Sequence, residues 1–240
     1  MVIAGVDLVR FGSVRHPVGR RARLLRALKV DHVVDVGANV GQFGAELPAS
    51  GFAGKILSIE PMALAYSELK RKSAQDPNWS ALQYAIGRWE GLLTLHIAGN
   101  SASSSVLWML PLHQEAAPET AYVGEETVSL RRLDSLLADV LPSGSRAFLK
   151  ADVQGYELEV LTGAGARLND FVAVQLELSL VPLYADAPLA EEVQRFMAQA
   201  GYQLAGVEPG FADPVSGRLF QMDAIYVRSD QLGELRGGAR

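Results

Sequence analysis

The stretch "HVVDVGANVGQF" at residues 32–43 constrains the fold more than any other part of the chain. A run of valines interrupted by Asp35 is followed by Gly37, Asn39 and Gly41 on alternate residues, and then by a helical pattern. A buried strand that enters a glycine-spaced turn and continues into a helix is typical of the first unit of an open α/β sheet. Such a turn leaves backbone N–H groups open to a small molecule at the start of the helix. The stretch therefore predicts a ligand site as well as a strand.

The rest of the chain repeats this alternation of short apolar runs and helical patterns. The expected strands are residues 32–37, 55–60, 80–87, 146–153 and 171–179. The expected helices are residues 41–47, 62–74, 131–139, 155–168 and 187–200, and Pro48 with Ser50–Gly51 should end the first of them early. Strands that are apolar on both faces are covered by helices on both sides. The pattern predicts a doubly wound, Rossmann-like α/β fold with a mostly parallel sheet.

Three regions depart from the simple alternation. Residues 201–210 and 217–228 are two strand patterns around a turn-rich linker, which predicts a hairpin and one antiparallel strand at the C-terminal end of the sheet. Residues 80–99 predict a second hairpin that turns at Arg88–Gly91. Residues 99–125 are polar and then broken by prolines, and we expect a lid-like insertion over the edge of the sheet.

We expect one domain over residues 31–230, preceded by a helical extension at 1–30 and followed by a tail at 231–240. The basic stretch 18–29 has leucines at helical spacing, which favours a surface helix with an apolar stripe over a membrane or nucleic-acid binding element. This helix and the apolar part of the insertion are candidate surfaces for a homodimer.

Composition excludes several classes of function. The net charge of −5 gives no reason to expect a nucleic-acid partner, and the absence of cysteine excludes disulfides, thiolate metal sites and a cysteine nucleophile. No apolar run approaches the roughly 20 residues of a membrane span. The N-terminal residues lack the pattern of a secretion signal, so we expect a cytoplasmic enzyme.

The glycine turn and the acids near it indicate which ligand the site takes. A dinucleotide fingerprint requires G-x-G-x-x-G, but counting from Gly37 the second and third glycine positions hold Asn39 and Gln42. This disfavours a nucleotide-sugar or NAD-dependent oxidoreductase. Glu60 ends the next strand, where an acid accepts hydrogen bonds from ribose hydroxyls. Asp35 would repel phosphates but suits a cationic ligand. S-adenosylmethionine is such a ligand, because it carries a ribose and a positive charge but no phosphate.

The segments "VVDVGANVGQF", "ILSIEP", "NSASSSVL", "RRLDSLL" and "FLKADVQGYELEVLTGA" together resemble the FkbM family of S-adenosylmethionine-dependent methyltransferases. The resemblance runs from about residue 30 to 228. It implies a seven-stranded class I methyltransferase sheet and transfer of a methyl group to oxygen, often on a sugar or a natural product. Ala151 and Pro48 depart from the family pattern, since a larger aliphatic residue and a longer helix would be usual there.

The resemblance also implies which residues hold the cofactor. The residues implied to contact S-adenosylmethionine are Asp35, Gly37, Asn39, Gly41 and Glu60, with Ala85 and Ile86 near the adenine.

A second acidic centre is expected at the ends of two later strands. Lys150 and Asp152 lie on one face of their strand, and Glu177 lies near the end of the next one. Asp152 is the candidate general base for a hydroxyl, and Lys150 is the alternative base. Asp152 and Glu177 together are candidate ligands for Mg²⁺. The structural alternatives are a helix cap by Asp152, an ion pair of Glu177 with an arginine, and a salt bridge of Lys150 with Glu157 or Asp152.

Two further residues and two further functions remain open. His113, within the insertion, is a third catalytic candidate if it swings over the site, and Asp223 in an apolar strand needs either a buried partner or a functional reason. The leading hypothesis is an O-methyltransferase acting on a small-molecule or glycosylated acceptor, including glycolipids and natural products. The alternatives are the oxidoreductase and a non-catalytic binding module with a methyltransferase fold.

Overall fold

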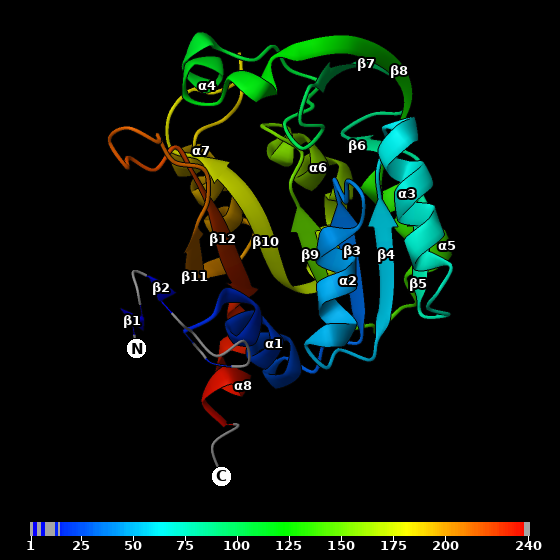
Figure 1. The fold of residues 1–240 in the computed structure, drawn as a ribbon. Helices are drawn as coiled ribbons and strands as arrows, with labels where there is room; N and C mark the ends of the chain where they lie inside the picture. Colours follow the sequence, from blue (N-terminus) through cyan, green and yellow to red (C-terminus); the bar gives the residue numbers. More distant parts are fainter. Residues whose placement is uncertain (1, 4–5, 8–12, 14, 238–240) are drawn as a thin grey trace.

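The computed structural model describes residues 2–3, 6–7, 13 and 15–237 (Figure 1). Its main sheet has seven strands in the order β11-β12-β10-β9-β3-β4-β5. The strands are β3 (His32–Val36), β4 (Lys55–Ile59), β5 (Trp79–Leu82), β9 (Ala147–Ala151), β10 (Phe171–Ser179), β11 (Tyr202–Pro209) and β12 (Gln221–Arg228). β12 runs antiparallel to both of its neighbours, and the remaining pairs are parallel. The predicted C-terminal hairpin and mixed sheet are confirmed.

Helices cover both faces of this sheet, as Figure 1 shows. One layer contains α1 (Pro17–Ala27), α2 (Gln42–Ala49), α3 (Ala63–Ser73) and α8 (Leu232–Gly237), and the other contains α5 (Leu133–Val140), α6 (Glu157–Ala164) and α7 (Ala190–Gln199). Successive side chains of a strand point to opposite faces, so Val33 packs with the first layer and Val34 with the second. This arrangement explains why the strands are apolar at nearly every position.

A second sheet lies beyond the carboxyl ends of the main strands. It has three strands, β6 (Ala85–Gly87), β8 (Tyr122–Arg132) and β7 (Gly91–Ala98), in that order. The prediction of one strand over 80–87 is therefore wrong, because β5 and β6 belong to different sheets. The hairpin across Arg88–Gly91 is also wrong, since β8 lies between β6 and β7 and pairs with both. Local alternation cannot reveal a strand that enters from so much later in the chain.

The structure confirms one predicted helix end, that of α2, and differs at another, that of α6. α2 is 8 residues long and ends just after Pro48, as the proline and the Ser50–Gly51 pair predict. α6 ends at Ala164, earlier than predicted, and the 3₁₀ helix η2 (Gly165–Asp170) follows it. Gly165 marks this change with a φ of 52°, a left-handed conformation that suits glycine.

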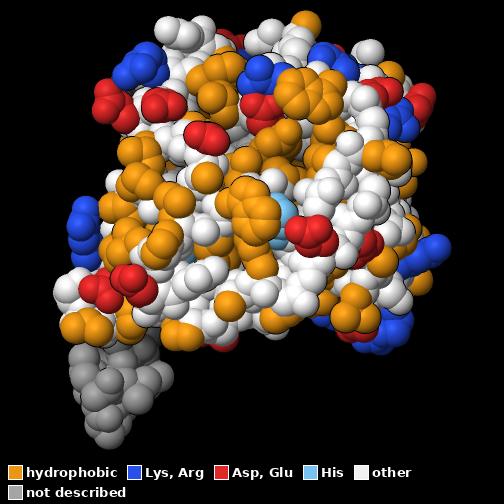
Figure 2. Space-filling view, turned by 90° about the horizontal axis from the view of Figure 1, so that it is seen from above, with side chains coloured by type: hydrophobic (Ala, Val, Ile, Leu, Met, Phe, Trp, Pro, Cys, Tyr) orange, Lys and Arg blue, Asp and Glu red, His pale blue; other side chains and the backbone are white. Residues whose placement is uncertain are grey.

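The insertion and the second sheet form a layer over the carboxyl edge of the main sheet (Figure 1). The insertion contains α4 (Pro111–Ala116) and η1 (Pro118–Thr120), and its last residues belong to β8 because that strand begins at Tyr122. Figure 2 looks onto this layer and shows hydrophobic side chains spread over it. Trp108, Leu92 and Val123 are among the exposed ones.

Two short strands, β1 (Val2–Ile3) and β2 (Val6–Asp7), pair with each other, and η3 (Ser229–Gln231) precedes α8. Across the residues that the structure describes, none of the helices combines the length and apolar content that a bilayer crossing needs.

Candidate active site

A cavity of about 540 Å³ opens at the carboxyl end of the main sheet. The chain runs from β3 to β4 and β5 on one side and later returns to β9 and β10 on the other, so strand order reverses between β3 and β9. Ligands of open α/β sheets bind at such a reversal. The cavity volume is in the range of small-molecule sites.

A row of polar residues crosses the sheet below this cavity. Ser58, Asp35 and Lys150 are register partners on β4, β3 and β9, and Gln175 is the partner of Lys150 on β10. Trp79 Nε1 donates to Ser58 Oγ at 3.0 Å, and Ser58 Oγ donates to Asp35 Oδ2 at 3.2 Å. Buried polar groups need such partners, and these two hydrogen bonds link Trp79, Ser58 and Asp35 within the helix-covered sheet.

Asp35 lies at the centre of this row and is fully buried. It does not line the cavity. Burial raises the pKa of the Asp35 carboxyl, while Lys150 and Ser58 oppose that rise. Asp35 Oδ1 accepts no hydrogen bond from the described residues and faces the Lys150 ammonium at 3.9 Å.

The glycines of the turn are required by packing. Gly37 has a φ of 77°, and a Cβ there would lie 1.8 Å from the main-chain oxygen of Asp152. Gly41 has a φ of 83°, and a Cβ there would approach Leu69 and Trp79 to about 3 Å. Gly37 and Asn39 line the cavity, whereas Gly41 faces the helical layer and does not.

Glu60 joins the turn after β3 to the end of β4. Its Oε2 accepts the Asn39 N–H at 2.8 Å, and its Oε1 accepts the Met62 N–H at 2.9 Å. Burial raises the pKa of the Glu60 carboxyl to about 7, against these two hydrogen bonds. Glu60 lines the same cavity as the turn, and so do Ala85 and Ile86. The structure thus brings five of the seven residues implied for the cofactor to one cavity.

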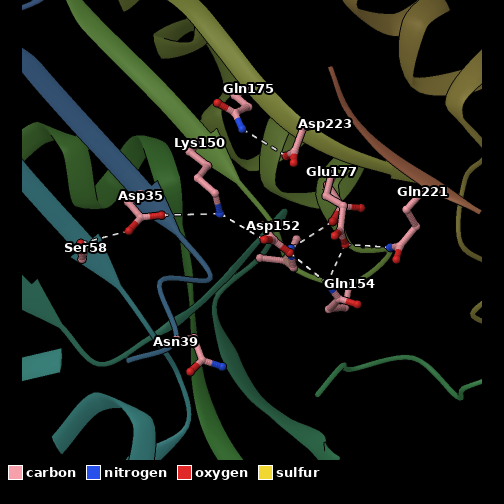
Figure 3. A network of polar contacts seen from close by, with 12 residues as sticks. Asp35, Asn39, Ser58, Lys150, Asp152, Gln154, Gln175, Glu177, Gln221 and Asp223 are labelled. Carbon is pink, nitrogen blue, oxygen red and sulfur yellow. Dashed lines mark hydrogen bonds and ion pairs between the residues drawn. The ribbon is translucent and has the colours of Figure 1, made fainter. Parts of the chain in front are cut away.

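Asp152 lies on the side of the turn opposite to Glu60, and each of its carboxylate oxygens has a donor partner (Figure 3). Lys150 Nζ lies 3.1 Å from Asp152 Oδ2, and Gln154 Nε2 donates to Asp152 Oδ1 at 2.9 Å. Gln154 Nε2 also donates to Glu177 Oε2 at 2.6 Å, and Gln221 Nε2 donates to the same oxygen at 2.7 Å. The salt bridge expected between Lys150 and Asp152 is present.

The remaining structural alternatives for this centre are wrong. Glu157, and not Asp152, accepts the N–H groups of Val153 and Gly155 before α6. The hydrogen bonds described for Glu177 come from two glutamines and not from an arginine.

Gln154 is a residue that sequence reasoning missed. It has a φ of 54°, and its Oε1 accepts a hydrogen bond from the Tyr184 hydroxyl at 2.7 Å. A non-glycine residue in the left-handed region next to a polar cluster is a signal of a functional site, but it is visible only in the structure.

Lys150 is buried among carboxylates. Burial opposes its charge, but Asp152, Asp35 and Asp223 together outweigh that effect and raise its pKa. The Lys150 ammonium therefore remains protonated at neutral pH.

Asp152 and Glu177 do not fit a Mg²⁺ site. The described residues contain no group of three or more His, Asp or Glu side chains arranged to hold a metal. Glu177 does not line the cavity, and the two carboxylates share an amide donor where a cation would have to lie.

The structure also places His113 and Asp223, whose roles the sequence left open. His113 is buried, packs against the rings of Tyr184 and Phe211, and does not line the cavity. Burial lowers the pKa of His113 to about 4. Asp223 has a buried partner, because Gln175 Nε2 donates to its Oδ1 at 3.1 Å, and it also lines the cavity.

The methyltransferase FkbM domain family matches residues 35–204, which is more than half of the chain. The chain belongs to this family. The FkbM domain is also similar to the methyltransferase sdnD of Sordaria araneosa, with 32% identity over 158 residues that cover 55% of the chain and 59% of that protein. The chain thus spans about three fifths of the length of this relative.

The fold is also found in a solved structure. A protein of Thermobifida fusca assigned as a methyltransferase has a TM-score of 0.51 and 12% identity, over 88% of this chain and 78% of that one. The magnesium protoporphyrin IX methyltransferase of Synechocystis PCC 6803 with bound SAM has a TM-score of 0.47 and 12% identity, over 94% and 87%. The chain has the class I methyltransferase fold, and β12 is the antiparallel strand of its main sheet.

Proposed function

We propose that this protein is an S-adenosylmethionine-dependent O-methyltransferase whose acceptor is a hydroxyl of a sugar, glycolipid or natural product. The observation that carries the proposal is that Gly37, Glu60 and Asp152 line one cavity at the reversal of strand order. The family match supports methyl transfer, and it favours a methyltransferase over an NAD-dependent oxidoreductase.

The lining of the cavity fits S-adenosylmethionine. Glu60 offers a carboxylate to the ribose hydroxyls, and Ala85, Ile86 and Tyr84 offer an apolar surface to the adenine. The carboxyl groups that line the cavity favour a negative potential that suits a sulfonium. The cavity volume is sufficient for the cofactor and part of an acceptor.

The bound cofactor would supply a methyl group on a sulfonium, from which the carbon–sulfur bond breaks toward sulfur. The protein would hold the acceptor hydroxyl in line behind that carbon, and most of the acceleration comes from this positioning. Asp152 would take the hydroxyl proton as the new oxygen–carbon bond forms, since each of its oxygens has capacity for a further hydrogen bond. The products are the methyl ether, S-adenosylhomocysteine and a proton.

Lys150 would assist without acting as the base. Its raised pKa keeps it protonated, so it has no lone pair for a proton. Its ammonium, 3.1 Å from Asp152 Oδ2, would instead orient that carboxylate toward the acceptor. This leaves Asp152 as the proton acceptor in the proposed reaction.

The charge of the cavity supports a neutral acceptor. Its lining includes Glu46, Asp152, Glu208 and Asp223, in addition to Glu60, against Lys150 and Arg21. Negative potential of this kind disfavours a phosphate-bearing acceptor such as RNA or DNA. Acceptor hydroxyl groups can donate hydrogen bonds to these carboxylates.

The proposal is tested by incubating the protein with methyl-labelled S-adenosylmethionine and panels of sugars, glycolipids and polyketide-type alcohols. We expect label in a base-stable methyl ether, which the Asp152→Asn variant should form about 10²- to 10⁴-fold more slowly. Label in a base-labile methyl ester, in an amine or in nucleic acid would contradict a sugar, glycolipid or natural-product hydroxyl as the acceptor. Binding of S-adenosylhomocysteine without transfer to any acceptor would favour the non-catalytic binding module.

A further inference from the structure

Among the described residues, the lysine and arginine side chains that line the cavity are Lys150 and Arg21, and they are held differently. The Lys150 ammonium lies between Asp152 and Asp35 at the sheet. Arg21 comes from α1 and is only 7% exposed. Its NH2 group lies 2.9 Å from Glu46, and its NH1 group makes longer contacts of 3.4 Å with both Glu208 and Gln175. The described hydrogen bonds thus use three of the five N–H donors of this guanidinium.

Arg21 lies beside the glycine turn. Its guanidinium carbon is 4.8 Å from the centre of the Phe43 ring. Phe43 is in the first turn of α2, which begins directly after Gly41. Lys150 Nζ is 5.4 Å from the same ring. α1 and α2 cover the same face of the sheet (Figure 1). Arg21 is therefore at the part of the cavity that borders the turn and β9.

The strand order decides which end of a bound nucleoside would reach Arg21. Glu60 follows β4 on one side of β3, whereas Lys150 and Gln175 are on β9 and β10, on the other side. A ligand with its ribose at Glu60 that crosses the turn after β3 extends its opposite end toward β9, β10 and α1. In S-adenosylmethionine and S-adenosylhomocysteine, that end carries the α-carboxylate of the amino-acid part.

We propose that Arg21 binds this carboxylate, so that α1 completes the cofactor site. The inference rests on the proposed function, because it assumes a cofactor with an amino-acid part. A planar guanidinium matches a carboxylate with two parallel hydrogen bonds, and low exposure strengthens them. Glu208 and Gln175 fix the guanidinium above Phe43. Arg21 and Glu208 both lie outside residues 35–204, so the family match does not include this part of the site.

The test compares two ligands by isothermal titration calorimetry. S-adenosylhomocysteine carries the carboxylate, and 5′-methylthioadenosine is the corresponding nucleoside thioether without the amino-acid part. For Arg21→Gln we expect about ten- to hundredfold weaker binding of S-adenosylhomocysteine and unchanged binding of 5′-methylthioadenosine. Arg21→Lys keeps the positive charge but cannot make the two parallel hydrogen bonds of a guanidinium, so we expect an intermediate loss of affinity for S-adenosylhomocysteine. Arg23→Gln is the matched control, because Arg23 is an exposed residue of the same helix, and it should bind both ligands like the wild type.

The possible outcomes separate this inference from the function on which it rests. Equal weakening of both ligands in Arg21→Gln would mean that Arg21 only shapes the cavity, and unchanged binding of both would place the carboxylate elsewhere; either result overturns the inference. Should Arg21→Gln fail to fold by circular dichroism, Arg21→Lys decides by the same comparison. A wild-type protein that binds neither ligand would overturn the proposed function itself.

Discussion

Glu60 has the most informative carboxyl group of the cavity, because it is buried, faces the ligand space and has a pKa raised to about 7. A ribose hydroxyl donates to the ionised carboxylate more strongly than to the neutral acid. The ionised form dominates above the pKa and is lost as the pH falls through it. The affinity for a ribose ligand should therefore decrease on acidification.

We expect S-adenosylhomocysteine to bind about tenfold more weakly at pH 6 than at pH 8, as the linkage of binding to one ionisation near pH 7 requires. Isothermal titration calorimetry over this pH range measures the effect. Glu60→Gln should bind weakly at all pH values with a flat profile. A wild-type profile that is equally flat would show that Glu60 does not contact the ribose.

The prediction for Asp152 differs, because its proposed role is to accept the hydroxyl proton and not to bind the cofactor. Asp152→Asn should reduce the rate of methyl transfer by about 10²- to 10⁴-fold, the usual contribution of a general base. Its affinity for S-adenosylhomocysteine should stay within a few fold of the wild type. A parallel loss of affinity would assign Asp152 to cofactor binding.

At the scale of residues, the sequence predicted the place of a residue better than its contacts. The meeting of Gly37, Asn39 and Glu60 at one cavity follows from strand ends that lie at one edge. Ala85 and Ile86 line the same cavity, but only the family resemblance indicated them. The burial of Asp35 below that cavity and the bridging amide of Gln154 do not follow from any local pattern. They depend on the register of neighbouring strands and on one left-handed residue.

At the scale of elements, helix α2 connects the glycine turn to the core through Gly44. A Cβ at Gly44 would lie 2.4 Å from the nearest atom of the Trp79 ring. Trp79 is itself fixed by its hydrogen bond to Ser58, so it cannot easily move away. Helix propensity and packing therefore make opposite predictions for Gly44→Ala.

We expect Gly44→Ala to destabilise the protein by about 1–3 kcal/mol, as overpacked core substitutions do. Propensity alone would give a gain of roughly 1 kcal/mol. Urea denaturation measures the difference. Gly233→Ala in α8 is the control, because its Cβ would meet nothing, and it should be neutral or slightly stabilising. Increased stability of Gly44→Ala would contradict the packing of α2 on Trp79.

Elements with a strong local period were the predictable ones. β10 was predicted with the observed bounds, and the β11–β12 hairpin was predicted from its turn residues. β8 could not be placed, because its partners β6 and β7 precede it and local alternation carries no information on pairing. α1 was recognised as an amphipathic helix, but the role of Arg21 in the cavity depends on tertiary contacts with Glu46, Gln175 and Glu208.

At the scale of the whole molecule, the fold places the two acidic centres on opposite sides of one turn. Glu60 approaches from the β4 side, and Asp152 with Lys150 from the β9 side, with α1 along the same cavity. The central claim is that a nucleoside thioether lies across this turn. The alternation of strands and helices predicted this geometry. Residues of α1, β11 and β12 also line the cavity, and no local pattern indicates their approach to it.

A crystal structure of the protein with S-adenosylhomocysteine tests this claim most directly. We predict electron density for the ligand across Gly37–Asn39, with the ribose hydroxyls on Glu60 and the sulfur on the Asp152 side. Density for the ligand at another surface, or a cavity without ligand density at a saturating concentration, would contradict the account.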